Sequence, residues 1–214
     1  MSATRRSLTA YAPSVVHAAG VRRRKLDGWL ALAAGAGYVG LVPLARLDPM
    51  RPERFAFRAM NGTTGSVPAQ RVPQQLGTPW LLPGIAVVGF FTHRPALAVT
   101  AALALPLEKG LEVGVKLLFE RRRPDKVLDA VLHDDAPTEG GSYPSGHAAI
   151  AACAAWLIAA YLPRWSAGPL ATAVGATTFT RVHQGAHFPL DAVGGVLMGV
   201  SAGALLTFAF GVPG

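Results

Sequence analysis

The sequence has little cysteine and little charge. Its one cysteine, Cys153, lies inside an apolar run, so no disulfide can form within the chain, and the redox compartment stays open. Charged residues make up 15% of the 214 residues, against roughly 25% in an average soluble protein. Hydrophobic residues make up 51%, and the charges are concentrated between long apolar segments. This distribution predicts a single domain that crosses a membrane several times.

The sequence also predicts no cleavable signal peptide in its first residues. Residues 1–27 are polar and basic, and the apolar run 29–45 that follows has no clear small-x-small cleavage site after it. We therefore expect 1–27 to be a basic cytoplasmic tail and 28–210 to be one transmembrane domain. The stretch 46–77 mixes arginine with phenylalanine, and it is interpreted either as an amphipathic interfacial segment between the first two helices or as an ordinary loop.

Six apolar runs predict an all-α fold, a bundle of six transmembrane helices. A spanning helix needs about 20 residues, with a range of roughly 17 to 25. The runs have the approximate bounds 29–45, 76–91, 96–119, 147–162, 167–179 and 188–210. Six spans put both termini on one side of the plasma membrane. A cytoplasmic tail would then place the polar clusters described next at the extracytoplasmic face, although the arginine and lysine counts of the loops do not separate the two sides cleanly.

The net charge of +8 is consistent with a protein whose partner is the lipid bilayer. Positive flanks of membrane helices and attraction to anionic headgroups both produce such an excess. A nucleic-acid partner is not expected, because no basic surface interleaved with aromatic residues is present and the apolar runs would have no explanation.

Cations gather where apolar runs end. Lys116 and Arg123 are seven residues apart, so two helical turns place them on one face, and Arg181 adds a third cation from another run. Arginine matches phosphate oxygens bidentately and lysine acts as a point charge. Glu112 precedes Lys116 by four residues, and we predict that it lies beside Lys116 and helps to orient it. The alternative is that the helix ends near Leu107 and these charges are solvated.

Two histidines accompany these cations. Ser145, Gly146 and His147 directly precede an apolar run, where a helix N-terminus would suit an anion, although Ser145 could equally be an N-cap. Asp191 lies one turn after His187, and its carboxylate could take the Nδ1 proton and leave Nε2 as a nucleophile. His147 could then protonate a leaving oxygen. A metal site is the alternative interpretation of these histidine and aspartate residues, because both are also metal ligands. The surrounding arginine and lysine would repel a cation, so we expect no metal and no cofactor.

The three clusters resemble the signature of the type 2 phosphatidic acid phosphatase superfamily, which includes vanadium haloperoxidases. The matching patterns are Lys-x6-Arg-Pro, Pro-Ser-Gly-His and Ser-Arg-x5-His-x3-Asp, with Thr180 in the place of the last serine. The resemblance implies an all-helical core and metal-independent hydrolysis through a phosphohistidine. It assigns the nucleophile to His187, its orienting partner to Asp191, the general acid to His147, and phosphate binding to Lys116, Arg123, Ser145, Gly146 and Arg181. Thr180 and Glu112 are candidates for support, and His183 matches no position of the signature.

The expected function is that of an integral membrane lipid phosphatase. Candidate substrates are lipid phosphates and diphosphates such as phosphatidate, phosphatidylglycerophosphate and undecaprenyl diphosphate or another polyprenyl diphosphate. The alternatives are a lipid-binding or lipid-translocating protein of the same fold, without catalysis, and a vanadate-dependent haloperoxidase. The sequence leaves the oligomeric state open.

Overall fold

The computed structural model describes residues 8–62, 67–133 and 136–211, with side chains in the ranges 24–62, 70–133 and 136–211. These residues form α-helices, short 3-10 turns and loops, and no strand occurs among them. The α-helices are α1 (Leu8–Ala45), α2 (Arg51–Asn61), α3 (Val67–Gln75), α4 (Leu81–Phe91), α5 (Pro95–Leu118), α6 (Gly146–Ala159), α7 (Ala167–His183) and α8 (Pro189–Phe210). The predicted all-α class is confirmed.

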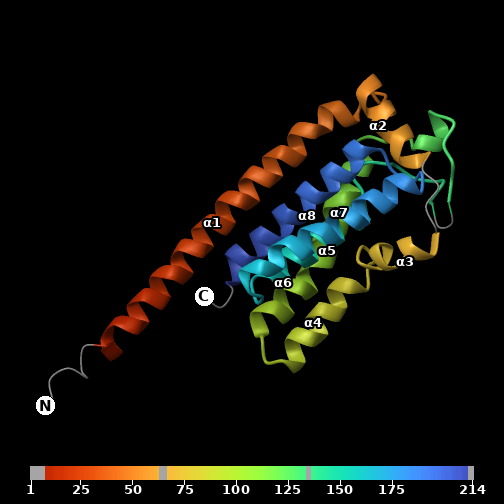
Figure 1. Ribbon diagram of the computed structural model, residues 1–214. Helices are drawn as coiled ribbons and strands as arrows, with labels where there is room; N and C mark the ends of the chain where they lie inside the picture. Colours follow the sequence, from red (N-terminus) through yellow and green to blue (C-terminus); the bar gives the residue numbers. More distant parts are fainter. Residues whose placement is uncertain (1–7, 63–66, 134–135, 212–214) are drawn as a thin grey trace, which may run out of the picture.

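Helix α8 lies at the centre of the bundle and packs against α1, α5, α6 and α7. Figure 1 shows the long α1 running beside α8 and extending past the bundle at its N-terminal end. Helices α2 and α3 lie at the other end, near the loop after α5 and the start of α8. This end of the bundle carries all three polar clusters.

Glycine allows α6 and α8 to approach closely. A Cβ atom placed on Gly195 or Gly199 would overlap the backbone carbonyl oxygen of Ser145 or Ala149 on α6. The facing residues of α6 are largely alanine and are buried. This close packing through glycine holds the start of α6 against the start of α8.

Two helices begin at a proline residue. Helices α5 and α8 begin at Pro95 and Pro189, since proline at the first helical position lacks only an N–H group that would have no helical partner. Helix α5 continues through Lys116 to Leu118, so the alternative that it ends near Leu107 is wrong.

Two expected boundaries differ from the structure. Helix α4 begins at Leu81 instead of residue 76, because residues 76–80 form turns that include Pro79, and its 11 residues span only about 16 Å at 1.5 Å per residue. Helix α1 begins at Leu8, within the stretch expected to be a tail, and is 38 residues long. By length and hydropathy, two helices among the described residues suit a membrane crossing: Arg24–Ala45 and Pro189–Phe210. The count of six spans stays a prediction.

The stretch 46–77 contains two short helices, so its interpretation as an ordinary loop is wrong. Helix α2 is amphipathic: Phe57 and Asn61 are buried, while Arg51 and Arg58 are exposed. The Asn61 amide donates hydrogen bonds to the carbonyl oxygens of Val131 and His183 at 2.8 and 2.9 Å. Helix α2 is thereby attached to the end of the bundle that carries the polar clusters, and its position at a membrane interface remains a prediction.

Candidate active site

Three cations surround His187, which lies in the loop between α7 and α8. Lys116 comes from the last turn of α5, Arg123 from the extended segment after it, and Arg181 from the last turn of α7. The electrostatic effects of all three act on the His187 imidazole. The structure therefore brings the three predicted cations together beside His187, and their role in binding phosphate stays a prediction. The expectation that two helical turns place Lys116 and Arg123 on one face is wrong, because α5 ends at Leu118 and Arg123 lies in extended backbone.

Arg123 is fixed by backbone carbonyl groups. Its Nε donates to the oxygens of Glu139 and Gly140 at 2.8 and 3.0 Å, and its Nη1 and Nη2 donate to those of Ala186 and Gly141 at 2.8 and 3.3 Å. A guanidinium has five N–H groups, and these contacts use three of them. Burial lowers the pKa of Arg123 from its ordinary value, against the opposing effect of nearby carboxylates. The side chain is held rigidly and keeps N–H groups that can bind an anion.

Ser145 and Gly146 form the start of α6. Ser145 occupies the N-cap position, but its side chain makes no capping hydrogen bond. Its hydroxyl is buried and has no hydrogen-bond partner among the described residues. Buried hydroxyl groups without a partner are unusual in proteins, so the interpretation of Ser145 as an N-cap is wrong for its side chain. An anion at this helix N-terminus would supply the missing acceptor.

The orientation of His187 differs from the expected one. Its Nδ1 lies 2.7 Å from the carbonyl oxygen of Ser142 and 3.9 Å from Oδ2 of Asp191, which exceeds hydrogen-bond range. The expectation that Asp191 accepts the Nδ1 proton directly is wrong in this geometry. Because a carbonyl oxygen can only accept, Nδ1 carries the proton, and the neutral imidazole has its lone pair on Nε2.

Asp191 is fully buried, and other donors occupy its carboxylate. Arg121 Nη1 donates to Oδ1 at 2.5 Å, and Oδ2 accepts from the Ser142 hydroxyl at 2.5 Å and from the Phe188 backbone N–H at 2.8 Å. These contacts explain why the carboxylate does not reach His187, although the two residues are one helical turn apart.

The surroundings of His187 keep its imidazole neutral. Burial lowers the pKa of His187 well below its ordinary value of 6.5, and the positive charges of Arg181, Arg123 and Lys116 lower it further. The hydrogen bond to the Ser142 carbonyl acts in the opposite direction and is outweighed. A buried neutral imidazole with a free Nε2 lone pair is the form that can act as a nucleophile.

Glu112 contacts Lys116, as predicted. The distance between Glu112 Oε1 and Lys116 Nζ is 2.6 Å, and Glu112 Oε2 is also 2.6 Å from Lys109 Nζ. A Cβ atom on Gly146 would lie 2.8 Å from Glu112 Oε2, so this carboxylate also borders the start of α6. The predicted position of Glu112 is confirmed, and its role in orienting Lys116 stays a prediction.

His147 is half-buried in the first turn of α6. The charges of Arg181, Lys109 and Glu112 act on its imidazole, so Arg181 is an electrostatic neighbour of both His147 and His187. The backbone at Gly77 lies directly against His147, where a Cβ atom would be 2.6 Å from the Cβ of the histidine. His147 is therefore placed beside the same cations as His187.

The remaining predicted candidates lie in α7. Thr180 is buried in its last turn. His183, which matches no position of the signature, is also buried; its Nδ1 lies 2.8 Å from the carbonyl oxygen of Met60, and its ring stacks on His133 with centroids 4.9 Å apart. His183 thus joins α7 to the end of α2.

Sequence reasoning missed Arg121, Ser142 and Glu53. Arg121 is the first of three consecutive arginines, only the last of which belongs to the signature, and nothing local distinguishes it. Glu53 lies in α2; its Oε2 accepts from Arg121 Nη2 at 2.8 Å, and its Oε1 accepts from the Leu190 backbone N–H at 3.1 Å. Contacts between residues so far apart in sequence leave no pattern that could have predicted them.

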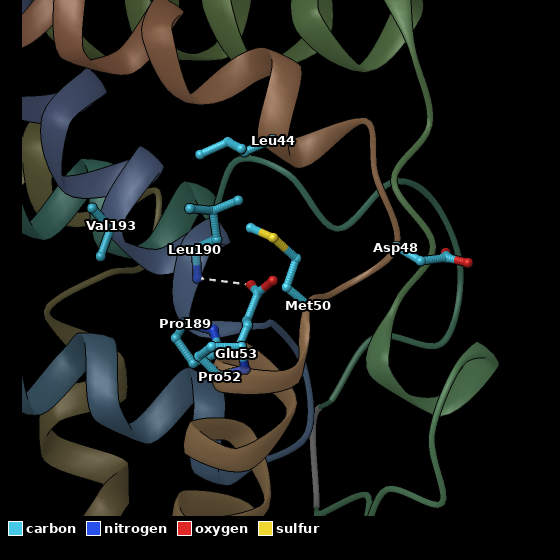
Figure 2. Close-up of a pocket in the computed structure, with 8 residues that line it drawn as sticks. All are labelled: Leu44, Asp48, Met50, Pro52, Glu53, Pro189, Leu190 and Val193. Atoms are coloured by element: carbon cyan, nitrogen blue, oxygen red, sulfur yellow. Dashed lines mark hydrogen bonds between the residues drawn. The ribbon is translucent and has the colours of Figure 1, made fainter.

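A mainly apolar pocket of about 310 Å³ borders this site. Figure 2 shows Glu53 in its wall, joined to the N–H of Leu190 at the start of α8. The lining residues come from the end of α1, from α2 and its preceding turn, and from α8: Leu44, Asp48, Met50, Pro52, Glu53, Pro189, Leu190 and Val193. None of the predicted catalytic residues lines this pocket, which borders the site through Glu53 and the start of α8.

Among the described residues, no three His, Cys, Asp or Glu side chains are grouped in a way that could hold a metal ion. The charges that act on His187 are instead those of Lys116, Arg123 and Arg181, and such a set suits a phosphate group.

Known proteins resemble the chain in sequence and in fold. It is 31% identical over 137 residues to phosphatidylglycerophosphatase B of Bacillus subtilis, covering 56% of this chain and 63% of that protein. It is 27% identical over 121 residues to an undecaprenyl-diphosphatase of Sulfolobus acidocaldarius, covering 55% and 57% of the two chains. The chain thus matches about three fifths of the length of these curated relatives.

Two crystal structures have the same fold. One is Aquifex aeolicus LpxE, with a TM-score of 0.68 and 23% identity over 75% of this chain and 97% of that one. The other is a transmembrane PAP2 type phosphatidylglycerolphosphate phosphatase from Bacillus subtilis, with a TM-score of 0.70 and 21% identity over 84% and 94% of the two chains. The family model of the PAP2 superfamily matches residues 95–211, which include every residue of the three clusters. The chain therefore belongs to the PAP2 superfamily, the family that its sequence motifs resemble.

Proposed function

We propose that the protein is an integral membrane lipid phosphatase that hydrolyses a phosphate monoester or diphosphate lipid through a phosphohistidine, without a metal. The main support is the arrangement around His187: a neutral buried imidazole, three surrounding cations and the unpaired Ser145 hydroxyl at a helix N-terminus. Lys116, Arg123 and Arg181 would bind the phosphoryl oxygens together with Ser145 and Gly146, and would stabilise the charge of the transition state.

In the first step, the Nε2 lone pair of His187 attacks the phosphorus atom. The P–N bond forms while the P–O bond to the leaving group breaks, and the electron pair of that bond passes to the leaving oxygen. Protonated His147 gives its proton to this oxygen as general acid. The lipid alcohol, or the lipid monophosphate when the substrate is a diphosphate, then departs.

In the second step, water hydrolyses the phosphohistidine. His147, now neutral, takes a proton from the water as its oxygen attacks the phosphorus atom. The P–N bond breaks, its electron pair returns to Nε2 of His187, and inorganic phosphate leaves. Both histidines end in their starting protonation states, so the cycle consumes only lipid phosphate and water.

The proposed location is the plasma membrane, with six spans and the site at the extracytoplasmic face. Support comes from the two helices that suit a membrane crossing and from a relative in fold that is named a transmembrane phosphatase. The named relatives act on phosphatidylglycerophosphate and on undecaprenyl diphosphate. Phosphatidate, phosphatidylglycerophosphate and polyprenyl diphosphate are accordingly the substrates to compare.

The test is phosphate release in detergent from these three lipids, with EDTA present. Wild type should release inorganic phosphate, and His187→Ala should reduce the release by several orders of magnitude, because removal of a nucleophile abolishes the covalent route. His93→Ala is the matched control, since His93 is exposed in the loop between α4 and α5.

The outcomes separate the candidate functions. Release by His187→Ala at the wild-type rate would contradict the assignment of the nucleophile. Tight binding of all three lipids by wild type, without turnover, would favour the lipid-binding alternative. Loss of release in EDTA that returns with a divalent metal would contradict the metal-independent mechanism.

A further inference from the structure

Arg121, Asp191 and Ser142 form a closed ring of hydrogen bonds beside His187. The Arg121 side chain donates to Asp191 Oδ1, and the Ser142 hydroxyl donates to Asp191 Oδ2, both at 2.5 Å. The Ser142 backbone N–H closes the ring by donating to the Arg121 carbonyl oxygen at 2.8 Å. The carbonyl oxygen of Ser142 then accepts from His187 Nδ1 at 2.7 Å. The Ser142 carbonyl group, which orients His187, is thus held in place through the contacts of Ser142 with Arg121 and Asp191.

Helix α2 supports this ring from outside the bundle. The two oxygens of Glu53 accept from Arg121 Nη2 and from the Leu190 N–H at 2.8 and 3.1 Å. Phe57, one turn later, packs on Phe188 with ring centroids 5.3 Å apart, and the Arg121 guanidinium lies 5.1 Å from the centroid of the same Phe188 ring. Phe188, the residue that follows His187, therefore packs between Phe57 of α2 and Arg121.

Arg121 differs from the three cations assigned to phosphate. Its side chain is 3% exposed, and its two terminal nitrogens are each paired with a carboxylate, Nη1 with Asp191 and Nη2 with Glu53. Arg123, in contrast, contacts neutral carbonyl groups. A guanidinium held between two carboxylates has little positive charge left for a phosphate, but removing it would leave two carboxylates in a buried place without their cation.

We propose that Arg121 and Glu53 are positioning residues, which hold Ser142 and Asp191 so that the Ser142 carbonyl orients His187 with Nε2 towards the phosphate. This inference rests on the proposed function, because it assumes that His187 is the nucleophile. It also assigns a role to α2: the helix fixes the orientation of the nucleophile from outside the bundle, without contacting the phosphate.

The first experiment compares Arg121→Gln with Arg122→Gln in the full-length protein in detergent. Arg122 is the matched control, because its side chain is 59% exposed and pairs with Asp48 on the surface. We expect Arg121→Gln to reduce kcat about 10- to 100-fold, by analogy with the loss on removal of residues that orient a metal-bound histidine. KM and the inhibition constant of inorganic phosphate should change by no more than about threefold, since phosphate binding is not removed. The Arg122→Gln variant should behave as wild type.

Two results would overturn the proposal. If Arg121→Gln has the kcat of wild type, Arg121 has no positioning role. If the loss appears instead in KM and in the phosphate inhibition constant, Arg121 binds phosphate directly. Neither result bears on whether His187→Ala abolishes turnover, so a failure of this inference is distinguishable from a failure of the proposed function.

Glu53→Gln provides a second test that does not depend on how Arg121→Gln folds. The substitution keeps the shape of the side chain and leaves the contact between Arg121 and Asp191 in place, so a smaller loss of kcat is expected. Because Glu53 acts through Arg121, adding Glu53→Gln to Arg121→Gln should cause no further loss. Full additivity of the two losses would contradict the coupling.

A spectroscopic readout tests the orientation without turnover. The ¹⁵N spectrum of labelled histidine should place the His187 proton on Nδ1 in wild type, with the signal assigned by its absence in His187→Ala. In Glu53→Gln the Nδ1 and Nε2 tautomers should both be populated. A wild-type proton on Nε2, or a Glu53→Gln spectrum identical to that of wild type, would contradict the proposal.

Discussion

At the scale of single residues, the neighbouring groups determine the protonation state of His187. Burial and three cations lower its pKa, and the Ser142 carbonyl accepts its Nδ1 proton. The neighbouring Asp191 supplies no direct hydrogen bond, yet it anchors the hydroxyl of the residue that does. The orientation of the proposed nucleophile is thus set by a backbone carbonyl group, whose acceptor role does not change with pH.

The lowered pKa of His187 has a measurable consequence. Because the pKa of His187 lies well below its ordinary value of 6.5, the imidazole should be neutral at pH 6.5, where an ordinary histidine is half protonated. We expect its ¹⁵N signals, assigned with His187→Ala, to keep the neutral pattern from pH 8 down to pH 6.5 in phosphate-free detergent solution. A titration midpoint at or above pH 6.5 would contradict the prediction.

The residues of the site were predictable to different degrees. Lys116, Arg123 and Arg181 could be predicted because cations at the ends of apolar runs meet at one end of a helical bundle. Direct pairing of His187 with Asp191 was wrong, because spacing along a helix says nothing about competing donors from elsewhere in the chain. Arg121 and Glu53 could not be recognised, since they are brought together only by the packing of α2 on the bundle.

At the scale of elements, apolar runs predicted the limits of α5 and α8 to within one residue, because both apolar stretches have proline at their start. The start of α7 at Ala167 was also predicted, but the helix continues to His183, beyond the expected end at residue 179. The start of α4 was placed five residues too early, because apolar residues and turns alternate around Pro79. The helical start of α1 was missed, since a polar and basic stretch carries no apolar period. Hydropathy thus identifies the buried helices better than the polar ones.

The contact between α6 and α8 gives a prediction at this scale. Gly199→Ala would place a methyl group against the carbonyl oxygen of Ala149, and overpacking of this kind costs about 1 to 3 kcal/mol. We expect a lower Tm in detergent and a lower kcat, because the two helices carry His147 and Asp191 at their starts. Thermal unfolding followed by circular dichroism would measure the change.

Gly175→Ala is the control for this substitution. Gly175 lies in α7, and a Cβ atom there has no neighbour within 4 Å. Its Tm should equal that of wild type or exceed it slightly, because alanine favours the helix over glycine. Equal losses of Tm in the two variants would contradict the assignment of the Gly199→Ala loss to the contact between α6 and α8.

At the scale of the whole molecule, the direction of α6 separates two ends of the bundle. The loop before α6 belongs to the site, whereas the 3-10 turn Arg164–Ser166 follows α6 at the opposite end. Charge counts of the loops do not decide which end faces the cytoplasm. Arg121 and Arg123 are buried, and their charges are used in contacts within the protein. They therefore cannot be counted as loop charges that indicate which side of the membrane is cytoplasmic.

Orientation can be measured with single cysteines. The only native cysteine, Cys153, is fully buried, so it should not react with an impermeant maleimide. Asp129 and Arg164 are exposed at the two ends of the bundle. We expect Asp129→Cys to be labelled in intact cells and Arg164→Cys only after permeabilisation, because the site is proposed to face outwards. The reverse pattern would place the site at the cytoplasmic face, and labelling of both in intact cells would contradict a membrane-spanning bundle.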